Sequence, residues 1–311
     1  MNNIFLHTRL LGLLTVLLGL SSFLDAGVVS YFRFEQDNDP NPSRTVSPDE
    51  MGGPDFISNS ARLDDSANPG SLPNTIVPQT GAPNTSSLDG LIDIDGSVAY
   101  NSALDLPSLT VELWARTEES TAVVISRSTT STVISGINDG FRIYDPSDIK
   151  VQYYVTNGST NTMVTIDTNQ AFDNVGTRGD ANTNWRHLAF SYEAATGTGT
   201  VYLDGVAVGS NDGPDNRDLY WGAGSPQPTV QVGVMMDGYN FSKNNTDDGF
   251  IDEIRFSSVA LEEDDLLINP VPEPSTILGG IGLGFFAAFQ IWRRRRNAKR
   301  PSPISPEAER I

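Results

Sequence analysis

The chain of 311 residues contains no cysteine and only two histidines, His7 and His187. The absence of cysteine excludes disulfide bonds, thiolate nucleophiles and zinc sites built on thiolates. His7 falls in the leader described below, so His187 is the only histidine of the mature chain. A single histidine argues against a Ser-His-Asp enzyme and against metal sites that need several histidines.

Basic residues are also scarce, since 20 lysines and arginines stand against 39 aspartates and glutamates, a net charge of −19. This balance argues against nucleic acid as a partner, because binding phosphates needs a basic face. It suits calcium, or a surface kept soluble at high salt. A solvated acidic surface is the simpler interpretation.

The N-terminal residues 1–26 predict a secretory signal peptide. An apolar run over residues 10–20 follows a weakly basic start, and the small residue Ala26 precedes Gly27. We therefore expect cleavage after Ala26. An uncleaved anchor is the alternative, although the apolar run is short for a span of about 20 residues.

The C-terminal end has three parts in a fixed order. A linker over residues 269–276 contains a Pro-Glu-Pro motif, an apolar segment over 277–292 follows, and a basic tail covers 293–311. We predict one transmembrane helix over 277–292, with the tail in the cytoplasm because basic residues mark that side. The residues concerned are the motif Pro272, Glu273 and Pro274 and the basic stop Arg293, Arg294, Arg295 and Arg296.

This order resembles the PEP-CTERM sorting signal of exported bacterial proteins. The resemblance implies that an exosortase, a membrane-embedded cysteine enzyme, removes the tail. Such proteins go to the envelope, the cell surface or the extracellular matrix of Gram-negative-type bacteria, anchored in the membrane before cleavage. The extension 297–311 is longer than the usual pattern, and a permanent anchor is the alternative. Without leader and tail, basic residues fall to 12 and acidic residues to 36, a net charge of −24.

Residues 27–268 alternate with the period of strands. In residues 108–116, Leu109, Val111, Leu113 and Ala115 face one way, and Thr110, Glu112, Trp114 and Arg116 face the other. Residues 184–209 predict three antiparallel strands. The last two are joined by Asp204-Gly205, a two-residue linker typical of a type I′ turn, in which both positions need positive φ.

Further strands are expected along the rest of the domain. They cover residues 28–35, 90–96, 123–127, 140–144, 149–155, 163–166, 229–234 and 249–256. Residues 37–89 are rich in Pro, Ser, Asn, Gly and Asp and predict a loop-rich excursion with two or three very short strands; disorder is the alternative for part of it. One helical turn is expected within 261–267. The fold class is all-β, one antiparallel jelly-roll sandwich of a dozen or so strands.

Four blocks, in this order, resemble LamG-like (concanavalin A-like) jelly rolls. They are Tyr31-Phe-Arg-Phe-Glu, Ser108-Leu-Thr-Val-Glu-Leu-Trp-Ala, the hairpin from Asn184-Trp-Arg-His to Leu203-Asp-Gly-Val, and Gly249-Phe-Ile-Asp-Glu-Ile-Arg-Phe. The resemblance implies the fold. It does not imply one function, because the fold carries lectins, adhesion modules, hydrolases and spacers.

Calcium is the cofactor that we consider, as a structural ion. Family members often hold Ca²⁺ where the first and last strands meet, and Ca²⁺ needs six to eight oxygen ligands. Glu35 closes the first strand and Asp252 lies on the last, so this pair is the candidate metal site. Strand carboxylates bonded to Arg255 or to backbone amides are the alternative.

Exposed aromatic side chains are the candidate ligand-binding residues, because sugars stack on aromatic faces. Tyr220 and Trp221 follow an acidic loop, and Tyr239 lies in another loop; ordinary packing is the alternative. Trp114 and Trp185 match core positions of the family. His187 is interpreted as a strand residue bonded within the sheet.

Catalysis is not expected. Hydrolases of this fold carry Glu-x-Asp-x-x-Glu on one strand, and here Pro40 stands where the second Glu belongs after Glu35 and Asp37. The predicted function is a non-catalytic binding or adhesion domain for polysaccharide or a surface protein. A structural matrix protein without a specific ligand, and a polysaccharide hydrolase with unrecognised acids, are the alternatives.

Overall fold

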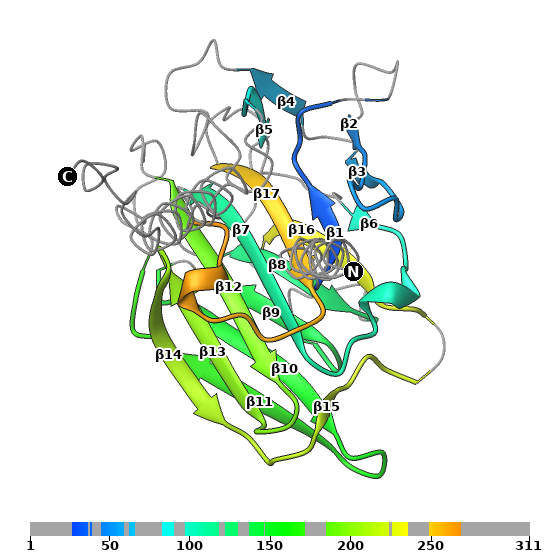
Figure 1. The fold of residues 1–311 in the computed structure, drawn as a ribbon, viewed down its shortest axis with the longest axis vertical. Coiled ribbons are helices and arrows are strands. Elements are labelled where there is room, and N and C mark those ends of the chain that lie inside the picture. Colours follow the sequence, from blue (N-terminus) through cyan, green and yellow to red (C-terminus); the bar gives the residue numbers. More distant parts are fainter. Residues whose placement is uncertain are drawn as a thin grey trace, which may run out of the picture. The chain divides into compact units, whose positions relative to one another are not determined.

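The computed structural model describes residues 27–36, 38, 45–58, 62–65, 83–89, 97–117, 122–129, 137–145, 147–171, 185–223, 226–235 and 249–268. All of these residues lie within one compact unit, Asp25–Pro270. Two antiparallel sheets lie face to face in it (Figure 1). No helix among these ranges is long and apolar enough to span a membrane.

The first sheet, called sheet A, has eight strands in the order β14-β13-β12-β7-β17-β5-β4. The first strand of the domain, β1, pairs with β17, so the two ends of the domain meet in this sheet. The strands are β1 (Val28–Phe32), β4 (Arg62–Asp65), β5 (Ser86–Asp89), β7 (Leu109–Thr117), β12 (Arg186–Glu193), β13 (Thr198–Leu203), β14 (Val206–Asp212) and β17 (Gly249–Ser257).

The second sheet, sheet B, has nine strands in the order β11-β10-β9-β8-β16-β6-β3-β2, with β15 paired to β10. Two short 3₁₀ turns complete the described fold, η1 (Ser102–Leu104) and η2 (Glu263–Asp265). The strands are β2 (Thr45–Ser47), β3 (Phe56–Ser58), β6 (Ser97–Val98), β8 (Ala122–Ser128), β9 (Phe141–Tyr144), β10 (Lys150–Thr156), β11 (Asn161–Asp167), β15 (Asp218–Leu219) and β16 (Thr229–Met235).

The main core lies between the sheets, where alternate residues of each strand point inward. From sheet A, Val111 and Phe190 are completely buried, and from sheet B Tyr153 and Ile143 are. The Tyr153 and Phe190 rings lie 5.1 Å apart between centroids, so large side chains of the two layers pack directly on one another. The residues of β7 alternate as predicted, with the odd-numbered ones in this core.

The tight turn after β13 is confirmed. Asp204 has φ of 52° and Gly205 has φ of 79°, and Leu203 pairs with Val206 across the turn. The Asp204 carboxylate accepts hydrogen bonds from His187 N (2.9 Å) and Arg186 Nε (2.5 Å). The side chain therefore ties the turn to β12 as well as fitting its backbone conformation.

Two expectations differ in detail from the structure. The excursion was expected to hold two or three very short strands, and its described part holds four, β2 to β5. The sequence predicts a dozen or so strands, whereas the described ranges hold seventeen. The number is higher because several strands are only two to four residues long. The expected helical turn is η2, which lies in an otherwise extended segment.

Candidate functional site

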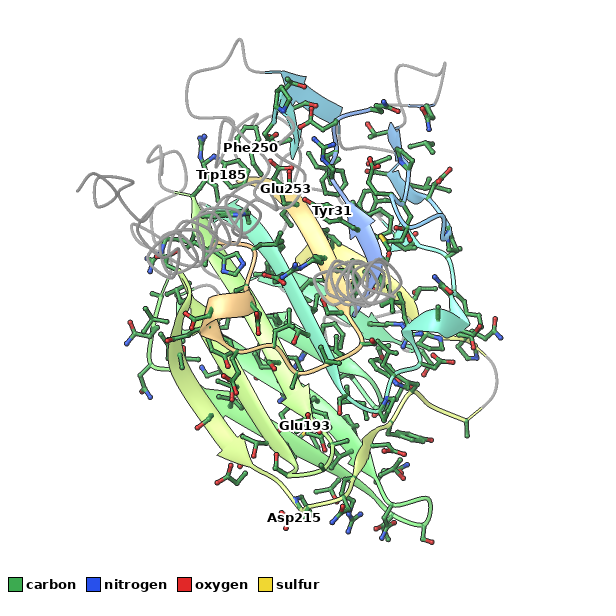
Figure 2. The ribbon with its side chains drawn as sticks, in the orientation of Figure 1. Tyr31, Trp185, Glu193, Asp215, Phe250 and Glu253 are labelled. Carbon is green, nitrogen blue, oxygen red and sulfur yellow. The ribbon has the colours of Figure 1, made fainter. Side chains whose placement is uncertain are left out.

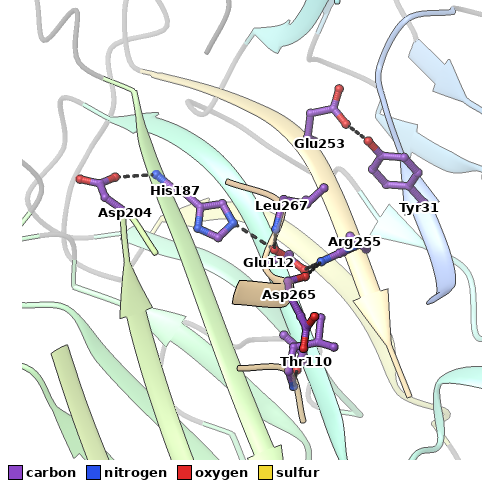
Figure 3. A network of polar contacts seen from close by, with 10 residues as sticks. Tyr31, Thr110, Glu112, His187, Asp204, Glu253, Arg255, Asp265 and Leu267 are labelled. Atoms are coloured by element: carbon purple, nitrogen blue, oxygen red, sulfur yellow. Dashed lines mark hydrogen bonds and ion pairs between the residues drawn. The ribbon is translucent and has the colours of Figure 1, made fainter. Parts of the chain in front are cut away.

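The outer face of sheet A carries a buried polar network centred on Glu112 of β7 (Figure 3). Its carboxylate accepts hydrogen bonds from Arg255 Nε (2.6 Å) and Leu267 N (2.6 Å), and lies 3.0 Å from His187 Nε2. Glu112 and His187 are completely buried, and Arg255 is 5% exposed. Neighbouring strands supply these groups, because Glu112 pairs with Arg255 across β17 and His187 follows on β12.

The network keeps Glu112 ionised. Burial by itself raises the pKa of Glu112, but the hydrogen bond from His187 and the positive charge of Arg255 outweigh it and hold the pKa below its usual value. An ionised carboxylate can only accept, so His187 Nε2 carries the proton of that contact. The prediction that His187 is bonded within the sheet is confirmed.

The network also fastens the last described segment, residues 258–268, which we call the strap. Thr110 Oγ1 donates to Val259 O (2.9 Å) and accepts from Leu261 N (2.8 Å). Arg255 Nη2 donates to Asp265 O (2.9 Å). The strap therefore crosses the outer face of sheet A, where it covers side chains that would otherwise meet solvent.

A second buried cluster lies on the same sheet, at the junction of β1, β17 and residues 83–89. Asn84 Nδ2 donates to Asp252 Oδ2 (2.8 Å), and the Tyr31 hydroxyl donates to Glu253. Asp252 is completely buried and Glu253 is 1% exposed. The strand has a β-bulge between residues 252 and 255, where Glu253 has a φ of 55°. The side chains of the two consecutive residues Asp252 and Glu253 are therefore both buried.

This cluster favours protonated acids. Burial raises the pKa of Asp252, and the neighbouring charge of Glu253 raises it further. Burial also raises the pKa of Glu253 to about 7, although the hydrogen bond from Tyr31 and the charge of Arg33 act in the opposite direction. Burial and the Glu253 charge raise the pKa of Tyr31 as well, so its hydroxyl remains a donor.

The candidate calcium pair, Glu35 and Asp252, lies at the edge of this cluster. The Glu35 carboxylate accepts from Thr85 N (2.9 Å) and Thr85 Oγ1. Asp252 accepts from Glu253 N (2.9 Å) and Asn84, and not from Arg255, which pairs with Glu112. Within the described ranges, no three His, Asp or Glu side chains are arranged to hold a metal.

Two oxygen atoms of the cluster nevertheless remain without a hydrogen-bond partner, Asn84 Oδ1 and Glu253 Oε1. Both are buried acceptors, and leaving such an atom unpaired costs about 1–3 kcal/mol. Carboxylate and amide oxygens are the ligands that Ca²⁺ prefers. The unpaired oxygens thus belong to Asn84 and Glu253, beside Asp252, whereas the Glu35 carboxylate bonds to Thr85.

The aromatic pair Tyr220-Trp221 follows β15. Trp221 Nε1 donates to Leu106 O (2.9 Å), and the Arg127 guanidinium lies 4.2 Å from the centre of its ring. Tyr220 bonds through its backbone to Tyr154 and Gly140 on sheet B. The polar atom and one face of Trp221 are therefore used inside the fold, whereas the side chain of Tyr220 is partly exposed.

Trp114 and Trp185 do pack, but outside the main core. Trp114 lies against His187 on the outer face of sheet A, with ring centroids 5.4 Å apart. Trp185 lies against Phe250, at 6.1 Å (Figure 2). Neither belongs to the core cluster that the described residues form between the sheets.

Other candidate residues lie outside the described ranges: the leader, strand 90–96, Tyr239, Pro272, Glu273, Pro274, segment 277–292, and Arg293 to Arg296. Two buried groups were missed, Glu112 with Arg255 and Tyr31 with Glu253. Alternation alone places Glu112 on the outer face of the sheet, where a side chain is expected to be exposed to solvent. The sequence did contain a signal that the outer face of sheet A is covered. Residues 261–267 are acidic but end in two consecutive leucines, which are stable only when they pack on an apolar surface.

Family models match two parts of the chain. A model described as the concanavalin A-like lectin/glucanases superfamily matches residues 87–267, and a model of the PEP-CTERM protein-sorting motif matches residues 270–296. Residues 268 and 269 separate the two matches, so the first ends within the strap and the second begins two residues after it. No curated protein matches the chain.

Solved structures resemble the fold. Domain 4 of AbnA, a GH43 extracellular arabinanase from Geobacillus stearothermophilus, solved with arabinotriose, has 16% identity and a TM-score of 0.45 over 78% of this chain and 97% of that one. The binding domain of botulinum neurotoxin serotype D has 14% identity and a TM-score of 0.44, over 78% and 50%. The CBM40 of Ruminococcus gnavus IT-sialidase has 12% identity and a TM-score of 0.36, over 53% and 84%. Likenesses this distant carry no argument about function.

Proposed function

The chain belongs to the concanavalin A-like lectin/glucanase superfamily and carries a PEP-CTERM protein-sorting motif, and from this premise we propose a non-catalytic binding or adhesion protein of the cell surface. Its jelly-roll domain takes polysaccharide or a surface protein as ligand. The proposed organisation is a leader over 1–26, the domain over 27–268, a linker over 269–276, an anchor over 277–292 and a cytoplasmic tail over 293–311. An exosortase removes the tail.

One observation carries the proposal: the match to the lectin/glucanase superfamily ends at residue 267, and the match to the protein-sorting motif begins at residue 270. Three buried acids are excluded as catalytic groups. Glu112 and Asp252 are fully buried and Glu253 nearly so. A glycosidase needs two carboxyl groups that touch the sugar bond, and these three are closed to a substrate.

A glycan array and a pull-down with surface extracts, each with and without Ca²⁺, test the proposal on the purified protein. Tyr220→Ala is the informative variant, because it keeps the backbone hydrogen bonds of Tyr220 to Tyr154 and Gly140 and removes a partly exposed ring. We expect it to weaken binding while the melting temperature stays unchanged. Met163→Ala, at a side chain 50% exposed on β11, is the matched control. Saturable binding to no glycan or protein in either condition would refute the proposal and favour a structural matrix protein.

Calcium is part of the proposal, as a structural ion beside Asp252, Glu253 and Asn84. The support is two adjacent buried carboxylates and two acceptor oxygens without partners. A ligand that binds only the folded state stabilises it. We therefore expect a higher melting temperature in Ca²⁺ than in chelator, and no such difference in Asp252→Asn. Identical melting of the unaltered protein in both conditions would remove calcium from the proposal.

The hydrolase alternative would need carboxyl groups other than Glu112, Asp252 and Glu253, because a catalytic acid must touch the sugar bond. Incubation with polysaccharides, followed by detection of new reducing ends, tests it. Turnover that is abolished by substitution of one carboxylate would establish a hydrolase and overturn the non-catalytic proposal.

A further inference from the structure

The strap ends only a few residues before the sorting motif in the sequence. The last hydrogen bond that fixes it, from Leu267 N to Glu112 Oε2, lies only five residues before Pro272. An extended chain covers at most about 3.6 Å per residue, so this contour is no longer than about 18 Å. Proline at 270 and again at 272 restricts φ and stiffens it further.

The end of the strap is firmly seated. Leu266 is 1% exposed and Leu267 is completely buried. Leu266 packs with Ala189 and Tyr202, and Ile268 packs against the same cluster. Only Asn269, Pro270 and Val271 remain between this seated end and the motif.

A peptide-processing enzyme holds its substrate as an extended segment, whose backbone and side chains contact the enzyme on both sides of the reacting bond. Residues 265–268 cannot occupy such a site while Leu267 N donates to Glu112 and Leu266 is buried on sheet A. An enzyme whose contacts extend upstream of Asn269 would therefore compete with the sheet for the same stretch of chain.

The strap can leave without opening the sandwich. The cluster of Leu266, Ala189 and Tyr202 is separate from the main core between the sheets. Segments that rest on an outer face open locally with a smaller free energy than the whole domain. Lifting the strap end exposes Glu112, whose remaining partners Arg255 and His187 stay in place on β17 and β12.

We propose that the docked strap restrains processing of the tail, so that the sorting enzyme acts when residues 265–268 lift from sheet A. This inference rests on the proposed removal of the tail. In that reaction one peptide bond near the motif breaks, its carbonyl passes to water or to an acceptor amine, and the tail leaves with a free α-amino group. Folding of the domain thereby sets the rate at which its own anchor is removed.

The test follows tail removal from the full-length chain over time, in a bacterium that expresses the sorting enzyme. One variant inserts Gly-Ser-Gly-Ser between Ile268 and Asn269, which leaves every strap contact intact and lengthens the free chain. The second is Leu266→Ala, which weakens the seat of the strap end. Leu219→Ala is the matched control, because Leu219 is 3% exposed in the main core, away from the strap.

We expect the insertion and Leu266→Ala both to speed tail removal, the latter by about tenfold for each 1.4 kcal/mol of packing that it removes from the strap. Leu219→Ala should leave the rate unchanged at a similar loss of melting temperature. Equal rates for the unaltered chain and the insertion would overturn the inference alone. If Leu219→Ala speeds tail removal as much as Leu266→Ala does, the inference is overturned, because the rate then depends on the overall stability of the domain and not on docking of the strap. Retention of the tail in every variant would refute the proposed processing and the inference together.

Discussion

The adjacent buried carboxylates of Asp252 and Glu253 predict that the protein loses stability as the pH rises toward neutrality. We consider Glu253→Gln, which removes one charge and keeps an oxygen for the Tyr31 hydroxyl. The folded-state pKa of Glu253 is about 7, against an ordinary value of 4.5. Because the folded pKa is the higher one, its contribution to stability is fully present below pH 4.5 and is lost as the pH rises through 7.

The size of the effect follows from the same two values. A difference of this size corresponds to about 3 kcal/mol of unfolding free energy. Asp252, whose pKa is also raised by burial, acts in the same direction. The free energy of unfolding of the unaltered protein should therefore fall by about 3 kcal/mol more than that of Glu253→Gln between pH 4.5 and 7.

Urea unfolding at a series of pH values, in chelator, measures this difference. Asp215→Asn is the control, because it removes one carboxylate from an exposed position at the opposite end of the domain (Figure 2). Its pH profile should match that of the unaltered protein. Parallel profiles for Glu253→Gln and the unaltered protein would refute the reasoning, since they would show that Glu253 titrates normally in the fold. Calcium, if it binds there, should flatten the profile of the unaltered protein.

Three further predictions concern other contacts. Glu112→Gln should lower the free energy of unfolding at pH 7 by about 3–5 kcal/mol in urea, because it leaves Arg255 buried without its counter-charge; a loss below 1 kcal/mol would contradict it. The unaltered protein should also lose stability below pH 4.5 more steeply than Glu112→Gln, because the folded pKa of Glu112 is lowered and its contribution disappears as the pH falls. Gly199→Ala should destabilise by about 1–3 kcal/mol in the same assay, since a Cβ there would lie 2.6 Å from the Tyr153 hydroxyl, and an unchanged midpoint would show that Tyr153 can move aside.

The sheets could be predicted because the relevant signals are local. Alternation along β7 and β12, and the Asp204-Gly205 turn, require only neighbours in sequence. The position of His187 followed from the same alternation. Each of these features depends on backbone period or on a two-residue turn, and the structure confirms them.

The polar networks could not be predicted because they depend on contacts far apart in the chain. Glu112 meets Leu267 across 155 residues, and Tyr31 meets Glu253 across 222. If it bound no metal, Asp252 was expected to bond to Arg255 or to backbone amides, and it does accept from the backbone amide of Glu253. The bulge at Glu253 changes which residues face which neighbours, and Arg255 pairs with Glu112 instead. A bulge moves side chains from one face to another without leaving a clear trace in the pattern of residue types.

The position of the strap also determines how the domain carries force. Tension through the C-terminal end of the domain reaches the strap first, and its contacts with Glu112, Thr110 and the outer face of sheet A are loaded one after another. The next element, β17, lies inside sheet A between β7 and its partners β1 and β5. A tethered domain would therefore extend by about eleven residues of strap while both sheets stay whole, and slack in the tether would let the strap dock again. Under flow, a domain tethered at its C-terminal end would therefore take up force by reversible undocking of this segment before its sheets open.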